Sequence, residues 1–165
     1  MENTVVNAPD VSTLNSAMPG GSETIMIVDD NVSIVSVMGC MLTHLGYSVY
    51  CAYDGNDAIA LYRKVQDTCI IKERDKGIEL VILDVFMDSM SGIAAAKQLS
   101  KINPDIKVIL SSGINLEDKK EILDELIGVS LCGCLSKPYN MKTLALSVRN
   151  ALDYGRCNPK GSQYL

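Results

Sequence analysis

The chain has 165 residues, of which 47% are hydrophobic and 21% are charged. That composition supports a single domain with a packed core and excludes wholesale disorder. Twenty acidic residues against fifteen basic ones give a net charge of −5, which disfavours binding to a phosphate backbone. We therefore expect no direct contact with nucleic acid.

The chain carries six cysteines, most of them in or beside apolar runs, where a free thiol packs as a small hydrophobe. Cys132 and Cys134 form a Cys-x-Cys pair, yet no second pair has zinc spacing and His44 is the only histidine. The N-terminus lacks the pattern of a secretory leader, and no apolar run is long enough to span a membrane. We expect a reduced, cytoplasmic protein with no structural zinc site and no membrane span.

Polar segments occupy both ends of the chain. We interpret residues 1–22 as a flexible leader, residues 23–154 as the folded domain and residues 155–165 as a polar tail.

Strand and helix patterns alternate between these ends. A short apolar run predicts the first strand at 25–28, and apolar residues at helical spacing from Ile34 to Leu45 predict a helix that Gly46 ends. The later strands are predicted, in chain order, at 47–52, 80–83, 108–110 and 131–135. The later helices are predicted at 58–65, 91–102, 116–127 and 141–152, the last with Asn140 as its N-cap. The charged stretch 66–77 is interpreted as a solvated loop.

Five strand–helix units with short, apolar strands predict an α/β fold, a doubly wound five-stranded parallel sheet with helices on both faces. Ligands of such sheets bind at the carboxyl ends of the strands. The polar residues that follow each predicted strand are therefore the candidates for a functional site.

Acidic, hydroxyl and amino groups follow four of the strands. Asp29 and Asp30 follow the first strand, Asp84 the third, Ser112 the fourth and Lys137 the fifth. Neighbouring carboxylates repel one another, and Mg²⁺, which prefers oxygen ligands, relieves the repulsion. A carboxylate can also accept a phosphoryl group, for which an ammonium and a hydroxyl are suitable partners.

Taken in this order, the strand-end residues resemble the receiver domain of two-component response regulators, over about residues 23–153. The resemblance is carried by Ile27-Val28-Asp29-Asp30-Asn31, Leu83-Asp84-Val85-Phe86-Met87, Gly92, Ser112-Gly113 and Lys137-Pro138-Tyr139. It implies a flavodoxin-like sheet with the strand order 2-1-3-4-5. It also implies that Asp84 is the phosphoacceptor and that Mg²⁺ is held by Asp29, Asp30, Asp84 and the backbone carbonyl of Phe86.

The same resemblance assigns roles to the residues after the last two strands. Ser112 is expected to bond a phosphoryl oxygen and to couple phosphorylation to a loop shift. Lys137 is expected to pair with the phosphoryl group, and the Lys137–Pro138 peptide is expected to be cis. Gly113 is expected to leave room for the incoming group.

The resemblance implies a signalling protein and not an enzyme, with at most slow self-catalysed phosphorylation and dephosphorylation. The expected donor is a histidine kinase or a phosphotransfer protein, and the chain could be a stand-alone regulator or part of a hybrid kinase. A downstream effector is expected to bind the surface formed by the fourth helix, the fifth strand and the fifth helix. A homodimer is a further possibility.

Three positions depart from the family. Asp88 stands where relatives often have Pro, and Phe86 stands where they often have a polar residue that affects the phosphoryl lifetime. Cys134 stands in place of an aromatic switch residue. A pseudo-receiver that binds proteins without taking phosphate therefore remains an alternative.

A second alternative is an aspartyl-phosphate phosphatase on a similar sheet, although that class carries Asp-x-Asp after the first strand and here the two carboxylates are adjacent. The site residues also have simpler possible roles. Asp29 and Asp30 could cap the first helix, and Asp84 could be a loop-end carboxylate with no chemistry. Ser112 could cap the fourth helix or bond the backbone, and Lys137 could be a surface lysine.

Overall fold

The computed structural model describes residues 18–72, 77–116 and 119–155, without the side chains of 70–72. Most of the expected leader, residues 1–17, and most of the expected tail, residues 156–165, lie outside the described residues. Among the described helices, none is both long enough and apolar enough to cross a membrane.

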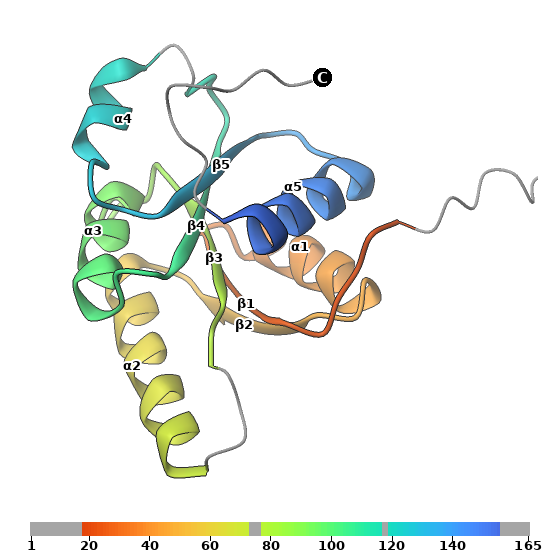
Figure 1. Ribbon diagram of the computed structural model, residues 1–165. Helices are drawn as coiled ribbons and strands as arrows, with labels where there is room; N and C mark the ends of the chain where they lie inside the picture. The colour runs from red at the N-terminus through yellow and green to blue at the C-terminus, as the bar shows by residue number, and fades with distance from the viewer. Residues whose placement is uncertain (1–17, 73–76, 117–118, 156–165) are drawn as a thin grey trace, which may run out of the picture.

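Within the described ranges, five strands form one parallel sheet, in the order β2-β1-β3-β4-β5 (Figure 1). The strands are β1 (Thr24–Val28), β2 (Ser48–Ala52), β3 (Leu80–Asp84), β4 (Lys107–Ser112) and β5 (Leu131–Ser136). The predicted fold class and strand order are therefore confirmed. Every residue of the central strand β3 is buried, as its uninterrupted apolar run predicts for a strand covered on both faces.

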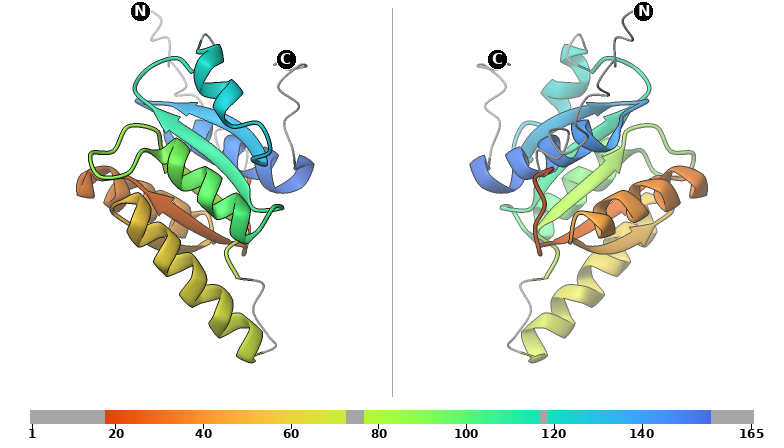
Figure 2. Two further views of the ribbon diagram at one scale, coloured as in Figure 1. Left: turned by 90° about the vertical axis from the view of Figure 1, so that its left-hand side faces the viewer. Right: turned by 90° about the vertical axis from the view of Figure 1, so that its right-hand side faces the viewer.

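In the part of the chain that the structure describes, five helices cover the two faces of the sheet. They are α1 (Val32–His44), α2 (Gly55–Lys72), α3 (Gly92–Ile102), α4 (Lys120–Glu125) and α5 (Met141–Tyr154). Helices α1 and α5 bury Met38, Leu42, Leu144 and Val148 against one face, whereas α2 and α3 pack on the other (Figures 1 and 2). This doubly wound arrangement leaves the carboxyl ends of the strands uncovered at one edge.

Helix α2 is longer than the sequence predicts. The interpretation of 66–77 as a loop is wrong for residues 66–72, which continue the helix, while 73–76 lie outside the described residues. Val65 is buried and Cys69, one turn later, packs against the same core cluster, so the apolar stripe continues. The extended α2 reaches past the end of the sheet in Figure 2.

Helix α4 spans Lys120–Glu125 and is therefore shorter than the predicted 116–127. Lys119 occupies the N-cap position and makes no side-chain capping bond, and no residue of the helix is buried. Beyond the helix, Leu126 and Ile127 donate to carbonyls three residues earlier, so the chain ends in a tight turn before Gly128.

A β-bulge interrupts the pairing of β4 with β5. Val108 pairs with Leu131 and Ile109 pairs with Gly133, so Cys132 is the extra residue. Cys132 consequently packs into the core on the α1–α5 face, and Cys134 packs against the core on the opposite face. The two thiols of the Cys-x-Cys pair therefore do not converge on one metal position.

The described end of the expected leader packs on the domain. The N–H of Gly21 donates to the carbonyl of Leu45 at 3.1 Å. Arg149 of α5 binds both carboxylate oxygens of Glu23, at 2.8 and 3.2 Å. These contacts hold the chain against α5 just before β1 begins.

Candidate functional site

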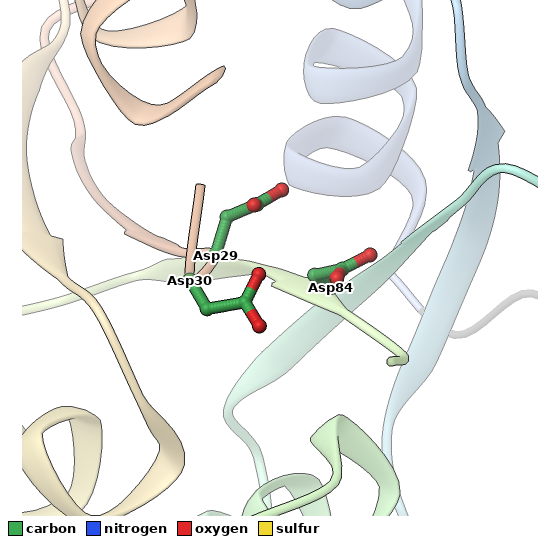
Figure 3. Close-up of side chains that lie close together, drawn as sticks. All are labelled: Asp29, Asp30 and Asp84. Carbon is green, nitrogen blue, oxygen red and sulfur yellow. The ribbon is translucent and has the colours of Figure 1, made fainter. Parts of the chain in front are cut away.

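Three carboxylates meet at the carboxyl edge of the sheet. Asp29 follows β1 directly and Asp84 ends β3, and the pairing of Val28 with Leu83 places these two strand ends side by side. One oxygen of each of Asp29, Asp30 and Asp84 lies within 4.8 Å of the others (Figure 3). Asp29 is 2% exposed and Asp84 6% exposed, whereas Asp30 faces solvent.

Lys137 joins two of these carboxylates. Its Nζ lies 2.6 Å from Oδ2 of Asp29 and 2.9 Å from Oδ1 of Asp84. The backbone N–H of Lys137 donates to the carbonyl of Ser112 at 2.7 Å, which fixes the end of β5 beside β4. The Lys137–Pro138 peptide is cis, as expected. Lys137 is therefore part of the acidic site and not an independent surface residue.

The charges in the site shift one another's pKa values. Burial raises the pKa of Asp84, and the nearby Asp29 and Asp30 charges add to the rise, while Lys137 opposes it. Burial by itself would lower the pKa of Lys137, but its bonds to Asp29 and Asp84 outweigh burial and raise it. The ammonium is thus firmly protonated, and it offsets part of the cost of two buried carboxylates.

Asn31, and not Asp29 or Asp30, caps helix α1. Its side chain accepts hydrogen bonds from the N–H groups of Ser33 and Ile34. The N–H of Asn31 also donates to Oδ1 of Asp29 at 2.9 Å. The simpler reading of the two aspartates as helix caps is therefore not what the structure shows. The sequence signal for Asn31 was its place just before the first apolar-periodic residues.

Ser112 is buried at the end of β4, and its Oγ accepts a hydrogen bond from the N–H of Ile114 at 3.1 Å. It does not cap α4, which begins only at Lys120. In the register Asp84 pairs with Ser111, so Ser111 and Ser112 present their side chains to opposite faces of β4. The expected bond from Ser112 to a phosphoryl oxygen stays a prediction.

The loop between β3 and α3 runs beside the acidic site. A Cβ at Gly92 would lie 2.0 Å from the backbone oxygen of Asp84, so only glycine allows α3 to begin this close to the strand end. Phe86 is 55% exposed, and because its side chain is apolar it could serve a metal only through its backbone carbonyl. The N–H of Asp88 donates to Oδ2 of Asp30 at 3.4 Å, a contact that its residue type did not signal.

The donor set of this site suits a hard cation. The converging groups are carboxylate oxygens, which are the ligands that Mg²⁺ prefers, whereas the softer thiols of Cys132 and Cys134 pack against the core from β5. The excess of carboxylates over the single ammonium of Lys137 leaves negative charge for a cation to neutralise. The residues present therefore fit a divalent metal ion.

Two curated relatives resemble the chain over most of its length. Transcriptional regulatory protein ZraR of Salmonella typhimurium is 30% identical over 136 residues, which cover 82% of this chain and 28% of ZraR. Chemotaxis protein CheY of Treponema pallidum is 24% identical over 155 residues, which cover 90% of this chain and 99% of that protein. The chain thus spans just over a quarter of ZraR and nearly the whole of this CheY.

Two solved structures share the fold. Chemotaxis protein CheY4 of Vibrio cholerae matches with a TM-score of 0.67 and 25% identity, over 80% of this chain and 100% of that one. The CheX–CheY–BeF3–Mg²⁺ complex of Borrelia burgdorferi matches with a TM-score of 0.66 and 23% identity, over 78% of this chain and 88% of that one.

A family model described as the response regulator receiver domain matches residues 25–149. Apart from Thr24, the first residue of β1, that range contains the five strands of the sheet, and it includes the acidic cluster and Lys137. The chain belongs to the response regulator receiver domain family.

Proposed function

We propose that this receiver domain is a phosphorylation-dependent switch in which Asp84 accepts a phosphoryl group from a histidine kinase or a phosphotransfer protein. The observation that carries the proposal is the position of Lys137, whose Nζ binds Asp84 while Asp29 and Asp30 face the same point. The site joins a nucleophilic carboxylate, a fixed cation and two further metal-ligating groups at one edge of the sheet.

The transfer is a displacement at phosphorus. A carboxylate oxygen of Asp84 forms the new O–P bond, the N–P bond of the donor phosphohistidine breaks, and the electron pair returns to the imidazole nitrogen. Lys137 holds Oδ1 of Asp84 at 2.9 Å, so the orientation of the nucleophile is set before the donor arrives. The same ammonium of Lys137 would also stabilise the negative charge of the phosphoryl group as it enters the site.

Asp29, Asp30, Asp84 and the backbone carbonyl of Phe86 are the groups that would hold Mg²⁺. When bound, the ion supplies positive charge that neutralises phosphoryl oxygens. Asp29 is buried and bonded to Lys137 and to the N–H of Asn31, so it presents its remaining lone pairs in a fixed direction.

The response is expected to run through the loop after β4. Ser112 lies at the end of β4, and its Oγ accepts the N–H of Ile114, so rotation of this hydroxyl toward a phosphoryl group would release the loop that leads to α4. Helix α4 is short and buries no residue, so little packing resists its displacement. An effector that recognises the α4–β5–α5 surface, or a second copy of the chain, would bind the altered conformer.

The alternatives have less support. A pseudo-receiver needs no intact acceptor site, whereas here Asp84, Lys137 and both partner carboxylates converge. A phosphatase of the class considered would carry Asp-x-Asp after β1, where the chain has adjacent aspartates. The chain is therefore proposed to be its own substrate and not an enzyme acting on others. Cys40 and Cys51 are exposed free thiols, which fits a cytoplasmic location.

The test is labelling with acetyl phosphate and Mg²⁺, followed by detection of a base-labile acyl phosphate. We expect the wild type to be labelled and Asp84→Asn to lose the label, with Asp67→Asn, at an exposed position of α2, as a matched control that retains it. Undiminished labelling of Asp84→Asn would place the acceptor elsewhere. Catalytic turnover of a phosphomonoester would favour the phosphatase instead.

The metal is tested separately. Calorimetry should show weaker Mg²⁺ binding by the Asp29→Asn, Asp30→Asn double variant than by the wild type, because two anionic ligands are lost. Equal affinities would refute their role as ligands. In the wild type, beryllofluoride with Mg²⁺ should shift the NMR amide signals of Asp84, Ser112 and α4. An unchanged spectrum would refute the proposal that the domain is a phosphorylation-dependent switch.

A further inference from the structure

The three carboxylates of the site are held in place to different degrees. Asp29 accepts hydrogen bonds from Nζ of Lys137 at 2.6 Å and from the N–H of Asn31 at 2.9 Å. Asp84 accepts one from Nζ of Lys137 at 2.9 Å. Asp30 is solvent-exposed and, within the described part of the chain, its carboxylate has a single hydrogen-bond donor, the backbone N–H of Asp88 at 3.4 Å.

The loop that presents this N–H is well anchored. At its start, the N–H of Val85 donates to the carbonyl of Ser111, and at its end the N–H of Gly92 donates back to the carbonyl of Val85. Met87, directly before Asp88, is 9% exposed and belongs to the core. The backbone at Asp88 is therefore fixed relative to β3, and its N–H points at Asp30 before any ligand is bound.

We propose that Asp88 is a positioning residue for the metal site: its backbone N–H orients the carboxylate of Asp30, and its side chain adds negative charge at the mouth of the site. This inference rests on the proposed function, in which Asp30 is a metal ligand. At 3.4 Å the bond is long, so its contribution to folding stability is small. Its effect is geometric, because a free exposed carboxylate samples several rotamers and must be ordered when a metal binds.

The side-chain charge of Asp88 acts independently of the N–H. Asp29, Asp30, Asp84 and Lys137 carry three negative charges and one positive, a formal −2, and Asp88 makes this −3. Asp88 is exposed, so salt screens its effect on a divalent cation. The two contributions can therefore be separated by substitution and by ionic strength.

The experiment measures the Mg²⁺ dissociation constant by calorimetry for Asp88→Asn and Asp88→Pro, at low and at high salt. Asn keeps the N–H and removes the charge, so we expect about two- to fivefold weaker binding at low salt and near wild-type binding at high salt. Pro removes both, so we expect a further loss of about tenfold that persists at high salt. Equal constants for the two variants at high salt would overturn the positioning role.

A thermodynamic cycle with Asp30→Ala shows whether the effect runs through Asp30. Without that carboxylate there is nothing to orient, so Asp88→Pro should weaken Mg²⁺ binding no more than Asp88→Asn does in the same background. An additional loss from Pro in the Asp30→Ala background would mean that Pro distorts the loop, and the inference would be wrong. If Asp30→Ala itself binds Mg²⁺ like the wild type, the proposed metal site fails, and not only the role of Asp88.

A comparison of Asp30→Ala with the wild type covers the case in which the Pro variant does not fold. An amide proton bonded to a carboxylate resonates downfield, so Asp30→Ala should move the proton signal of the Asp88 amide upfield. Under the same change, the amide of Gly92, which is bonded to Val85, should stay in place. An unmoved Asp88 signal would show that this N–H does not hold Asp30.

Discussion

Asp84 and Lys137 form an ion pair with 2.9 Å between Oδ1 and Nζ, although 53 positions separate them in the chain. The same ammonium lies 2.6 Å from Asp29, so one cation is shared by two buried carboxylates. Side-chain exposures of 18%, 2% and 8% for Lys137, Asp29 and Asp84 mean that water screens this arrangement weakly. The site is thus electrostatically interdependent, and removal of any member changes the state of the others.

Lys137→Met should destabilise the domain, because two buried carboxylates lose their shared counter-ion. In the presence of a chelator we expect the free energy of unfolding to fall by about 3 kcal/mol or more, measured by urea denaturation. Saturating Mg²⁺ should recover a larger share of stability in the variant than in the wild type, since the ion replaces the missing charge. As a control, Lys97→Met removes an exposed pair with Glu125 and should cost about 0.5 kcal/mol. A Lys137 variant as stable as this control would contradict the shared-cation description.

Asp84→Asn should stabilise the metal-free domain at neutral pH. The pKa of Asp84 is raised in the folded state, chiefly by burial, so folding favours the protonated carboxyl. Its stabilising contribution is fully present below the unfolded-state pKa of about 4 and is lost as the pH rises through the raised folded-state pKa. The gain from Asn, followed by denaturation at several pH values, should therefore shrink as the pH falls toward that value. A gain that stays constant over the range would show that charge burial is not its cause.

Gly92→Ala should both destabilise the fold and impair labelling of Asp84. The added Cβ would lie 2.0 Å from the backbone oxygen of Asp84, so α3 or the end of β3 has to move. We expect a loss of about 1–3 kcal/mol of unfolding free energy. Gly133→Ala is the matched control, because a Cβ there meets nothing within 4 Å, and its unfolding free energy should stay within about 0.5 kcal/mol of the wild type. Similar losses in both variants would refute the steric explanation.

Ser112→Ala should uncouple phosphorylation from the loop after β4. We expect beryllofluoride with Mg²⁺ to shift the amide signals near Asp84 in this variant but to leave those of Ile114 and α4 close to their unbound positions. Ser112→Thr keeps the hydroxyl and should restore the wild-type pattern. Full propagation to α4 without the hydroxyl would assign the coupling to another residue.

The order of elements and the edge that carries the site could be predicted from the sequence. Short apolar runs such as Leu80–Leu83 have the pattern of strands buried on both faces, and their alternation with helices dictates a parallel sheet. In such a sheet every strand points the same way, so residues that follow the strands, including Asp29, Asp84 and Lys137, must share one edge. Local pattern and topology are sufficient for that conclusion.

Other features depended on contacts between residues far apart in the chain. The charges of 66–77 suggest a loop, but Cys69 packs on the core and α2 continues to Lys72. The bulge at Cys132, which turns Cys132 and Cys134 to opposite faces, is an adjustment of β5 to β4 and leaves no local pattern. The hydrogen bond to Asp30 is donated by the backbone N–H of Asp88, a group that every residue type except proline possesses. The sequence of side chains therefore could not predict it. Periodicity reports which face of an element is apolar, whereas the distances within a site are set only when the elements pack against one another.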